Sequence, residues 1–439
     1  MKQVLAAFFS ALILSSSFVP VIAIAQEGDE WDMDEWGEEE KVSYRYSGFV
    51  ELAVGTRLSS DPVISTDKTL ADLRAQLQFD KDFEASRFKF TADAYYDGVL
   101  DQSKIQIREL AWQGSLISII DLGEWSQQFD IKVGQQILTW GTGDYVFLND
   151  LFAKDFQSFF AGRDDDYLKA PSLSLKVSGF FDLANVDFVV TPKFTPDTYI
   201  NGDYFSFFSP FAGMNVAPSF DVTSPNKPSS PEFALRVYKT IGSTEYAGYA
   251  YKGFHKSPSS FTTLGEPYFA ELNVFGASAR MPFASGLLNF EFAYYDSRED
   301  ENGSEALVPN SQTRWLIAYE QELIKNLTAS AQLYLERTSD YDALMQNSLT
   351  PEYEPNENRV LVTQRLMYRA MQQTLTLNLF NFYSTSDEDG YLKLSADYSP
   401  VDQWKLSGGF NLFYGKDQYS FFNQFEDASN AFIRFKYFY

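Results

Sequence analysis

The sequence has no cysteine and only one histidine, His255, among its 439 residues. A disulfide framework, a thiol nucleophile and a cysteine-ligated metal centre are therefore excluded, and a single imidazole is left for catalysis or metal ligation. Basic residues are also scarce, with 35 Lys and Arg against 60 Asp and Glu and a formal net charge of -25. Because nucleic-acid affinity depends on clustered Lys and Arg, this balance argues against a nucleic-acid partner.

Long apolar runs are missing after the N-terminus. Residues 4–24 are almost all apolar or small, follow Lys2, and end on Ala23-Ile24-Ala25, which fits a cleavage site before Gln26. This pattern predicts a signal peptide over residues 1–25, and retention as a membrane anchor is the less favoured alternative. No later segment has 18 consecutive apolar residues, so no transmembrane helix is expected in the mature chain.

What the sequence has in excess is aromatic residues, 27 Tyr, 41 Phe and 7 Trp, beside a polar mean hydropathy of -0.26. From residue 42 onward apolar and polar residues alternate with a period of two, which is typical of strands with one apolar and one polar face. Eighteen such runs are present, over residues 42–58, 69–80, 86–97, 104–117, 128–140, 172–181, 185–195, 231–240, 244–254, 268–281, 286–296, 312–322, 326–337, 358–370, 373–384, 390–398, 404–414 and 430–439.

The connections between these runs alternate in length. Those after even-numbered runs are mostly short, whereas residues 141–171, 196–230, 256–267, 297–311 and 338–357 form long connections after odd-numbered runs. The pattern predicts an all-β fold over residues 42–439, a transmembrane antiparallel up-and-down β-barrel of about 18 strands, within a range of 14 to 18, with short periplasmic turns and long extracellular loops. A soluble β-sandwich is disfavoured, because it would turn so many outward aromatic residues to water.

The last strand ends the chain on an aromatic residue. Ile433, Phe435, Tyr437 and Tyr439 alternate with Arg434 and Lys436. This pattern resembles the terminal strand signal by which Gram-negative outer-membrane proteins are recognised for barrel assembly. The resemblance implies an outer-membrane location in a Gram-negative bacterium, the barrel-assembly machinery as a partner, and contact with outer-membrane lipid and lipopolysaccharide.

A narrower resemblance covers residues 128–195. The segments KVGQQ at 132–136, TWGTGD at 139–144, NDLF at 149–152 and LKAP at 168–171 look like the strand and long loop of proteobacterial porin-like families, including alginate-export-type and other substrate-specific porins. The resemblance implies a passive channel whose long third loop folds inward. The expected function is therefore passive diffusion of small hydrophilic solutes, charged or dipolar, through an outer-membrane porin.

Strand parity assigns side chains to the lumen. The expected channel-lining basic wall consists of Arg45, Arg74, Arg87, Lys89, Arg359, Arg365, Arg369, Lys393, Lys405 and Arg434, and the third long loop offers the constriction-loop acids Asp144, Asp150, Asp155, Asp164, Asp165 and Asp166. A basic wall opposite an acidic loop would create a transverse field that favours charged or dipolar solutes. The alternative is that these charges pair with one another inside a polar lumen.

Three further expectations concern the rest of the chain. The aromatic loop at 196–230, which contains Tyr199, Tyr204, Phe205, Phe207, Phe208, Phe211 and Phe220, is too apolar for water and should fold over or into the barrel. The acidic segment at 26–41 has nine acids within residues 27–40 and is either a solvated tail or a docking site for a periplasmic partner, in which case the barrel would serve as a scaffold in an export or electron-transfer complex. No enzyme activity, cofactor or metal is expected, because His255 is a lone loop histidine.

Overall fold

The computed structural model describes residues 44–217 and 225–439. The predicted signal peptide, the acidic segment and Phe220 lie outside these residues. Within them, eighteen strands form one antiparallel sheet. The strands are β1 (Tyr44–Arg57), β2 (Lys68–Asp82), β3 (Ser86–Asp97), β4 (Gln102–Ser115), β5 (Phe129–Gln136), β6 (Ser172–Phe180), β7 (Asn185–Thr191), β10 (Glu232–Ile241), β11 (Thr244–Phe254), β14 (Glu271–Phe283), β15 (Gly286–Ser297), β16 (Gln312–Ile324), β17 (Leu327–Thr338), β18 (Asn358–Ala370), β19 (Leu375–Ser384), β20 (Asp389–Val401), β21 (Trp404–Tyr414) and β22 (Asn430–Phe438).

The sheet closes on itself. Each strand pairs with the next along the chain, and β22 returns to pair with β1, with Leu52 opposite Phe435. Closure gives every strand of the sheet a neighbour on both sides, which a membrane barrel requires because lipid cannot satisfy backbone hydrogen bonds. The predicted closed barrel is confirmed, and all eighteen alternating runs coincide with strands. The largest shortening is at β5, which ends at Gln136 and not near 140.

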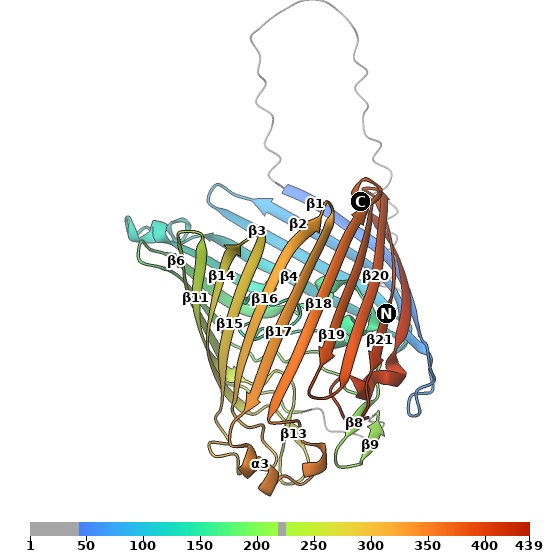
Figure 1. Ribbon diagram of the computed structural model, residues 1–439. Helices are drawn as coiled ribbons and strands as arrows, with labels where there is room; N and C mark the ends of the chain where they lie inside the picture. Colours follow the sequence, from blue (N-terminus) through green and yellow to red (C-terminus); the bar gives the residue numbers. More distant parts are fainter. Residues whose placement is uncertain (1–43, 218–224) are drawn as a thin grey trace, which may run out of the picture.

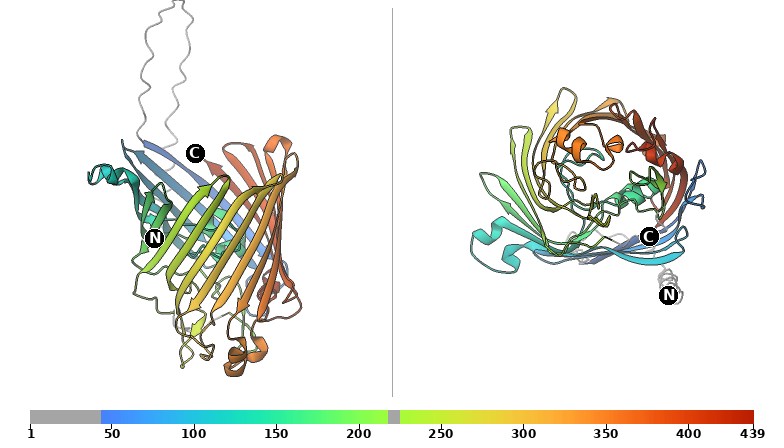
Figure 2. Two further views of the ribbon diagram at one scale, coloured as in Figure 1. Left: turned by 60° about the vertical axis from the view of Figure 1, so that its left-hand side comes forward. Right: turned by 90° about the horizontal axis from the view of Figure 1, so that it is seen from below.

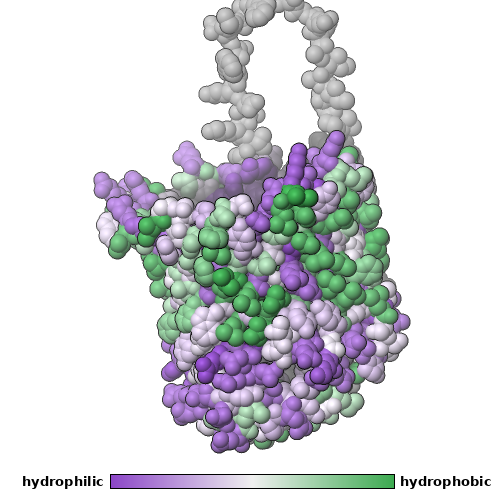
Figure 3. Space-filling model, viewed as in Figure 1, coloured by the Kyte–Doolittle hydropathy of each residue, from purple (hydrophilic) through white to green (hydrophobic). Residues whose placement is uncertain are grey.

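Alternating side chains point to opposite sides of the wall. Along β22, Ile433 is 50% exposed on the outer surface, whereas Arg434 is 7% exposed and points into the barrel. Phe435, Tyr437 and Tyr439 lie outward with Ile433, as the terminal pattern predicts. On the face shown in Figure 3, hydrophobic residues gather across the middle of the barrel, and hydrophilic residues gather at its two ends. This is the surface expected of strands that face lipid.

The two ends of the barrel differ in their connections (Figure 1). The end near the C-terminus, here called the turn end, has tight turns such as the one at Lys325 and Asn326, where Asn326 adopts φ 68°. The exception at this end is the longer connection that contains η1 (Leu116–Ser118) and η2 (Trp125–Gln128).

The opposite end, the loop end, has the long connections. They contain the short pairs β8 (Phe207–Ser209) with β9 (Met214–Val216) and β12 (Ser260–Phe261) with β13 (Pro267–Tyr268), together with α3 (Tyr341–Asn347), η4 (Pro351–Tyr353) and η6 (Asn423–Ala428). η5 (Met371–Gln373) belongs to the turn end. Among residues 44–217 and 225–439, no helix is long and apolar enough to cross a membrane.

The interior of the barrel is occupied by residues 137–171, which connect β5 to β6. This segment contains α2 (Phe156–Ala161) and η3 (Asp165–Leu168). Viewed along the barrel from the loop end, the helical segment lies inside the ring of strands (Figure 2). Phe159 and Phe160 belong to the main buried cluster, together with Tyr204 and Phe205 from the aromatic loop. Residues 137–171 and the Tyr204–Phe205 part of the aromatic loop therefore fold into the barrel, whereas Phe211 of the same loop is 57% exposed.

Candidate functional site

One carboxylate holds the start of residues 137–171 against the barrel wall. Glu291 on β15 accepts hydrogen bonds from the backbone N–H of Gly143 at 2.9 Å, the hydroxyl of Thr142 at 2.8 Å and the amide of Asn149 at 2.7 Å. Gly141 adopts φ 81°, and a side chain there would approach the Glu291 carboxylate to 3.3 Å. The glycines of the TWGTGD segment thus allow the backbone to reach a charged group on the wall.

The middle of the segment is fixed through α2 and the arginine that follows it. Asp155 caps the helix by accepting the Ser158 N–H at 2.8 Å, and Gly162 ends it at φ 84°. Arg163 then reaches the wall, where its guanidinium donates to both carboxylate oxygens of Asp72 at 2.7 and 3.2 Å. Both groups of this contact are buried, so the bidentate pair fixes the orientation of the helix.

Three of the loop acids meet basic residues that the sequence places on the wall. Asp164 lies 3.0 Å from both Arg434 and Lys436. Asp165 pairs with Lys393, and Asp144 lies 3.3 Å from Arg365. Burial alone would raise the pKa of Asp164, but Lys436, Arg434 and Lys405 outweigh burial and hold the pKa well below its usual range. Asp164 is therefore ionised at any pH the barrel experiences.

The remaining loop acids have other partners. Asp150 pairs with Lys154 of the same segment at 2.9 Å and accepts from the Thr139 hydroxyl at 2.8 Å. Asp155 serves as the helix cap. The carbonyl of Asp166 accepts from Arg108, whereas its side chain is exposed.

Most of the predicted basic residues lie away from the loop acids. Arg45 and Arg87 share the exposed Asp82 near the turn end. The other pairs are Arg74 with Asp93 at 2.7 Å, Lys89 with Glu109 at 2.7 Å, and Arg359 with Asp387 at 3.0 Å, while Arg369 is exposed at the end of β18. Lys405 is shared, since it lies 3.3 Å from Asp397 on the wall and 4.0 Å from the loop acid Asp164. The interior is thus a network of local ion pairs, which corresponds to the paired alternative more closely than to one continuous basic wall.

Two cavities lie on either side of residues 137–171. The outer cavity, toward the loop end, has a volume of about 490 Å³ and an aromatic lining that includes Tyr295, Tyr334, Phe382 and Tyr391. The inner cavity, toward the turn end, has a volume of about 650 Å³ and a polar lining that includes Lys89, Glu109, Arg280, Arg365 and Lys436. Tyr145, Phe147 and Asp150 line both cavities. These three residues therefore lie between the two cavities.

Tyr145 is the most constrained of the three residues. Its backbone adopts φ 55°, a conformation that an aromatic residue rarely occupies and that costs about 1–3 kcal/mol. Its hydroxyl donates to Asp165 at 2.6 Å, and its ring packs against Phe159 and Phe380 at 5.0 and 4.8 Å between centroids. The surrounding structure thus holds the ring in one place between the two cavities. No periodic pattern marks this residue in the sequence.

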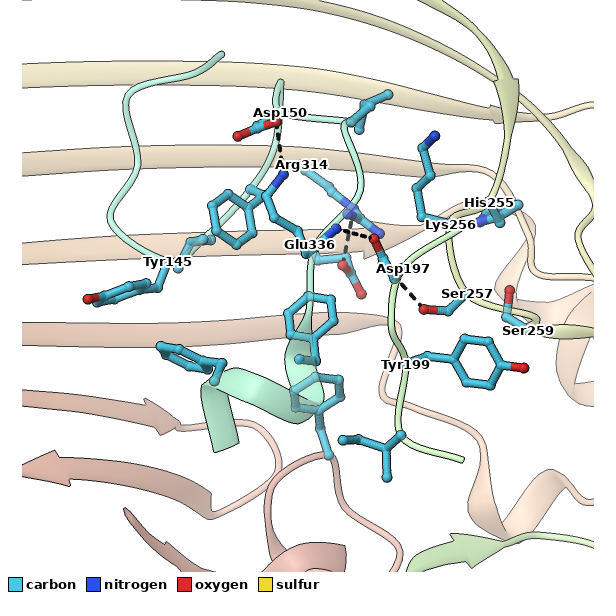
Figure 4. A pocket seen from close by; sticks show the side chains of 18 of the residues that line it. Tyr145, Asp150, Asp197, Tyr199, His255, Lys256, Ser257, Ser259, Arg314 and Glu336 are labelled. Atoms are coloured by element: carbon cyan, nitrogen blue, oxygen red, sulfur yellow. Dashed lines mark hydrogen bonds and ion pairs between the residues drawn. The ribbon is translucent and has the colours of Figure 1, made fainter. Parts of the chain in front are cut away.

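The charges around the outer cavity are paired as well (Figure 4). Arg314 lies 3.2 Å from Glu336, and Lys256 pairs with Glu232. Asp197 accepts the backbone N–H of Lys154 at 2.7 Å, and its burial raises its pKa to about 6. The cavity therefore changes charge near pH 6 and offers an aromatic surface at every pH.

His255, the one histidine, also lines the outer cavity. It is half-buried behind the end of β11, and desolvation followed by the influence of Arg314 lowers its pKa to about 4. Its Nε2 atom has no hydrogen-bond partner within residues 44–217 and 225–439.

Comparison with known proteins supports the fold. No protein-family model matches the sequence, and no curated protein resembles it significantly. Among solved structures, Pseudomonas aeruginosa OccK11 (OpdR) is similar with a TM-score of 0.53 at 8% identity, over 90% of this chain and 95% of that chain. Acinetobacter baumannii OccAB2 is similar with a TM-score of 0.52 at 9% identity, over 90% of this chain and 98% of that chain. The chain therefore has the fold of outer-membrane porins.

Proposed function

We propose that the protein is an outer-membrane channel of a Gram-negative bacterium, through which small hydrophilic solutes, charged or dipolar, diffuse passively. The observation that carries this proposal is the pair of cavities on either side of residues 137–171, which share Tyr145, Phe147 and Asp150 in their linings. A solute moving between the two ends of the barrel would pass these three residues. Fixed charges and an aromatic surface at this position would select among solutes by charge and shape.

The arrangement of the ends fits this proposal. The turn end would lie in the periplasm and the loop end outside the cell, as in other barrels with short turns on one side and long loops on the other. The outward face of β22 would present the signal read by the barrel-assembly machinery, and the hydrophobic residues across the middle of the barrel would contact outer-membrane lipid and lipopolysaccharide. The inward fold of residues 137–171 also favours the finer resemblance to alginate-export-type and related substrate-specific porins, because the sequence segments that carry this resemblance lie in and beside the same loop.

An enzymatic role is not part of the proposal. The only imidazole is half-buried, its buried Nε2 is without a hydrogen-bond partner among the described residues, and desolvation keeps the ring neutral at physiological pH. We propose that His255 contributes to the surface of the outer cavity and not to a reaction.

The experiment that tests the proposal is reconstitution of the refolded barrel. In planar bilayers we expect discrete conductance steps, and in a liposome-swelling assay we expect uptake of sugars, amino acids or organic acids below a size limit. A heat-modifiable, folded barrel that gives neither conductance nor swelling would contradict the proposal.

The acidic segment gives a second arm of the experiment. Deletion of residues 27–40 should leave conductance unchanged if the segment is a solvated tail. Loss of a co-purifying periplasmic protein on this deletion would favour the scaffold alternative.

A further inference from the structure

The pairing of the barrel wall is incomplete along β4. β5 pairs only with Leu110–Ser115, although β4 begins at Gln102. Residues 102–109 therefore have a strand partner on one side, β3, and none on the other side among the described parts of the chain. The cause is the short length of β5, which ends at Gln136 where the chain turns into the lumen.

This part of β4 lies on the lipid-facing surface. Ile105 and Ile107 are 66% and 41% exposed on the outer side of the strand. A strand edge that faces hydrocarbon leaves N–H and C=O groups without partners, and each such group costs several kcal/mol. One side chain bridges part of the opening, since Arg108 donates to the carbonyls of Asp166 at 2.8 Å and Lys169 at 3.2 Å. The remaining edge needs other hydrogen-bonding groups.

A cavity of about 450 Å³, here called the lateral cavity, lies at this edge. Gln106 and Ile107 of β4, Gln135 of β5 and Phe269 belong to its lining. Gln135 is on the outer face of the wall, because it pairs with Leu110 and Leu173, which are 41% and 49% exposed. Gln106 is on the inner face, because it pairs with Asp93, which is 0% exposed. The lateral cavity therefore lies at the open edge of the wall and combines one amide from each face with an apolar surface.

The lateral cavity is also next to the lumen. Asp197 and Tyr199 line both the lateral cavity and the outer cavity. The side chains of Asp197 and Tyr199 thus separate the lateral cavity from the outer cavity. A molecule in the lateral cavity would touch groups that shape the outer cavity.

We propose that the lateral cavity binds a single-chain amphiphile from the surrounding membrane. Its polar head hydrogen-bonds to the amides of Gln106 and Gln135 and to the open edge of β4, and its apolar body packs on Ile107 and Phe269. A volume of about 450 Å³ lies within the range of small-molecule sites, roughly 300–1,000 Å³. Because the site shares Asp197 and Tyr199 with the outer cavity, its occupancy alters the current through the channel.

The test uses the absence of native cysteines. A bimane label on Gln106→Cys, in the full chain in lipid nanodiscs, is titrated with brominated decanoate. The control label is on Gln364→Cys, which lies in β18 between two fully paired neighbours, opposite Ala331 and Asn381. We expect saturable quenching at position 106 and only a linear, partition-driven response at position 364.

A blocking variant and a second readout complete the experiment. Gln135→Phe removes one amide and fills the cavity, so it should abolish the saturable part of the quenching. Decanoate should reduce the single-channel current of the unlabelled protein with the same midpoint, and Gln135→Phe should lose this effect. Linear quenching at both positions, or saturable quenching that Gln135→Phe leaves intact, would overturn the inference. Conductance of the unlabelled barrel reports separately on the proposed channel function.

Discussion

The contact between Arg163 and the barrel wall predicts how firmly α2 is held in the lumen. The Arg163 side chain is 7% exposed, and its partners Asp72 and Asp97 are 1% and 0% exposed. Breaking a buried ion pair by removing one partner costs about 3–5 kcal/mol, because the other charge is left without compensation. Arg74 remains 3.4 Å from Asp72, so we expect the lower end of this range for Arg163→Met. At about 1.4 kcal/mol per factor of ten, detachment of α2 becomes roughly a hundredfold more frequent.

Hydrogen–deuterium exchange of the α2 amides measures this change directly. We expect exchange of residues 156–161 to accelerate by about two orders of magnitude in Arg163→Met, while the amides of the barrel strands keep their protection. The matched control is Arg298→Met, which breaks an exposed pair with Asp296, worth about 0–1 kcal/mol, and should leave α2 unchanged. Equal α2 protection in Arg163→Met and the wild type would refute the reasoning.

Two further predictions concern charge in the lumen. Because burial raises the pKa of Asp197 to about 6, its carboxyl is negative at pH 7.5 and neutral at pH 5. The preference of the channel for anions should therefore increase as the pH falls. The reversal potential in a salt gradient measures this preference. The variant Asp197→Asn should lose this pH dependence, whereas His255→Gln should keep it, since the pKa of His255 is lowered to about 4. An unchanged pH dependence of the reversal potential in Asp197→Asn would contradict the role given to Asp197. Arg365→Gln leaves the carboxylates of Asp144 and Glu320 without their cation, so it should increase the cation preference of the channel. The control Arg369→Gln, at the exposed end of β18, should change this preference less. Equal shifts in the two variants would argue against a role for the contact between Arg365 and the loop.

The fold could be predicted from the sequence because it depends on a local pattern. A strand that separates lipid from a polar lumen must alternate residue by residue, and residues 404–414 show this alternation without any knowledge of their neighbours. The inward fold of residues 137–171 is what the resemblance to porin-like families implies. Both features are carried by consecutive residues.

The partners within the lumen depend on contacts far apart in sequence. Asp164 and Lys436 meet only because the barrel closes between β22 and β1, and Glu291 meets Gly143 only because residues 137–171 cross the lumen. Strand parity gives the side of the wall on which a charge lies but not the charge it pairs with. Tyr145 could not be identified from the sequence for the same reason, because its role rests on two cavities formed by many strands.

The most direct test of the proposed constriction is the single-channel conductance of Tyr145→Gly. Glycine adopts a positive φ without strain, so this substitution removes the ring between the two cavities while it preserves the backbone of residues 137–171. The account predicts a higher conductance and a larger size limit in liposome swelling than in the wild type. Removal of a ring from the outer loops, in Tyr353→Ala, should change neither quantity. An unchanged conductance in folded Tyr145→Gly would contradict the claim that this residue lies between the two cavities.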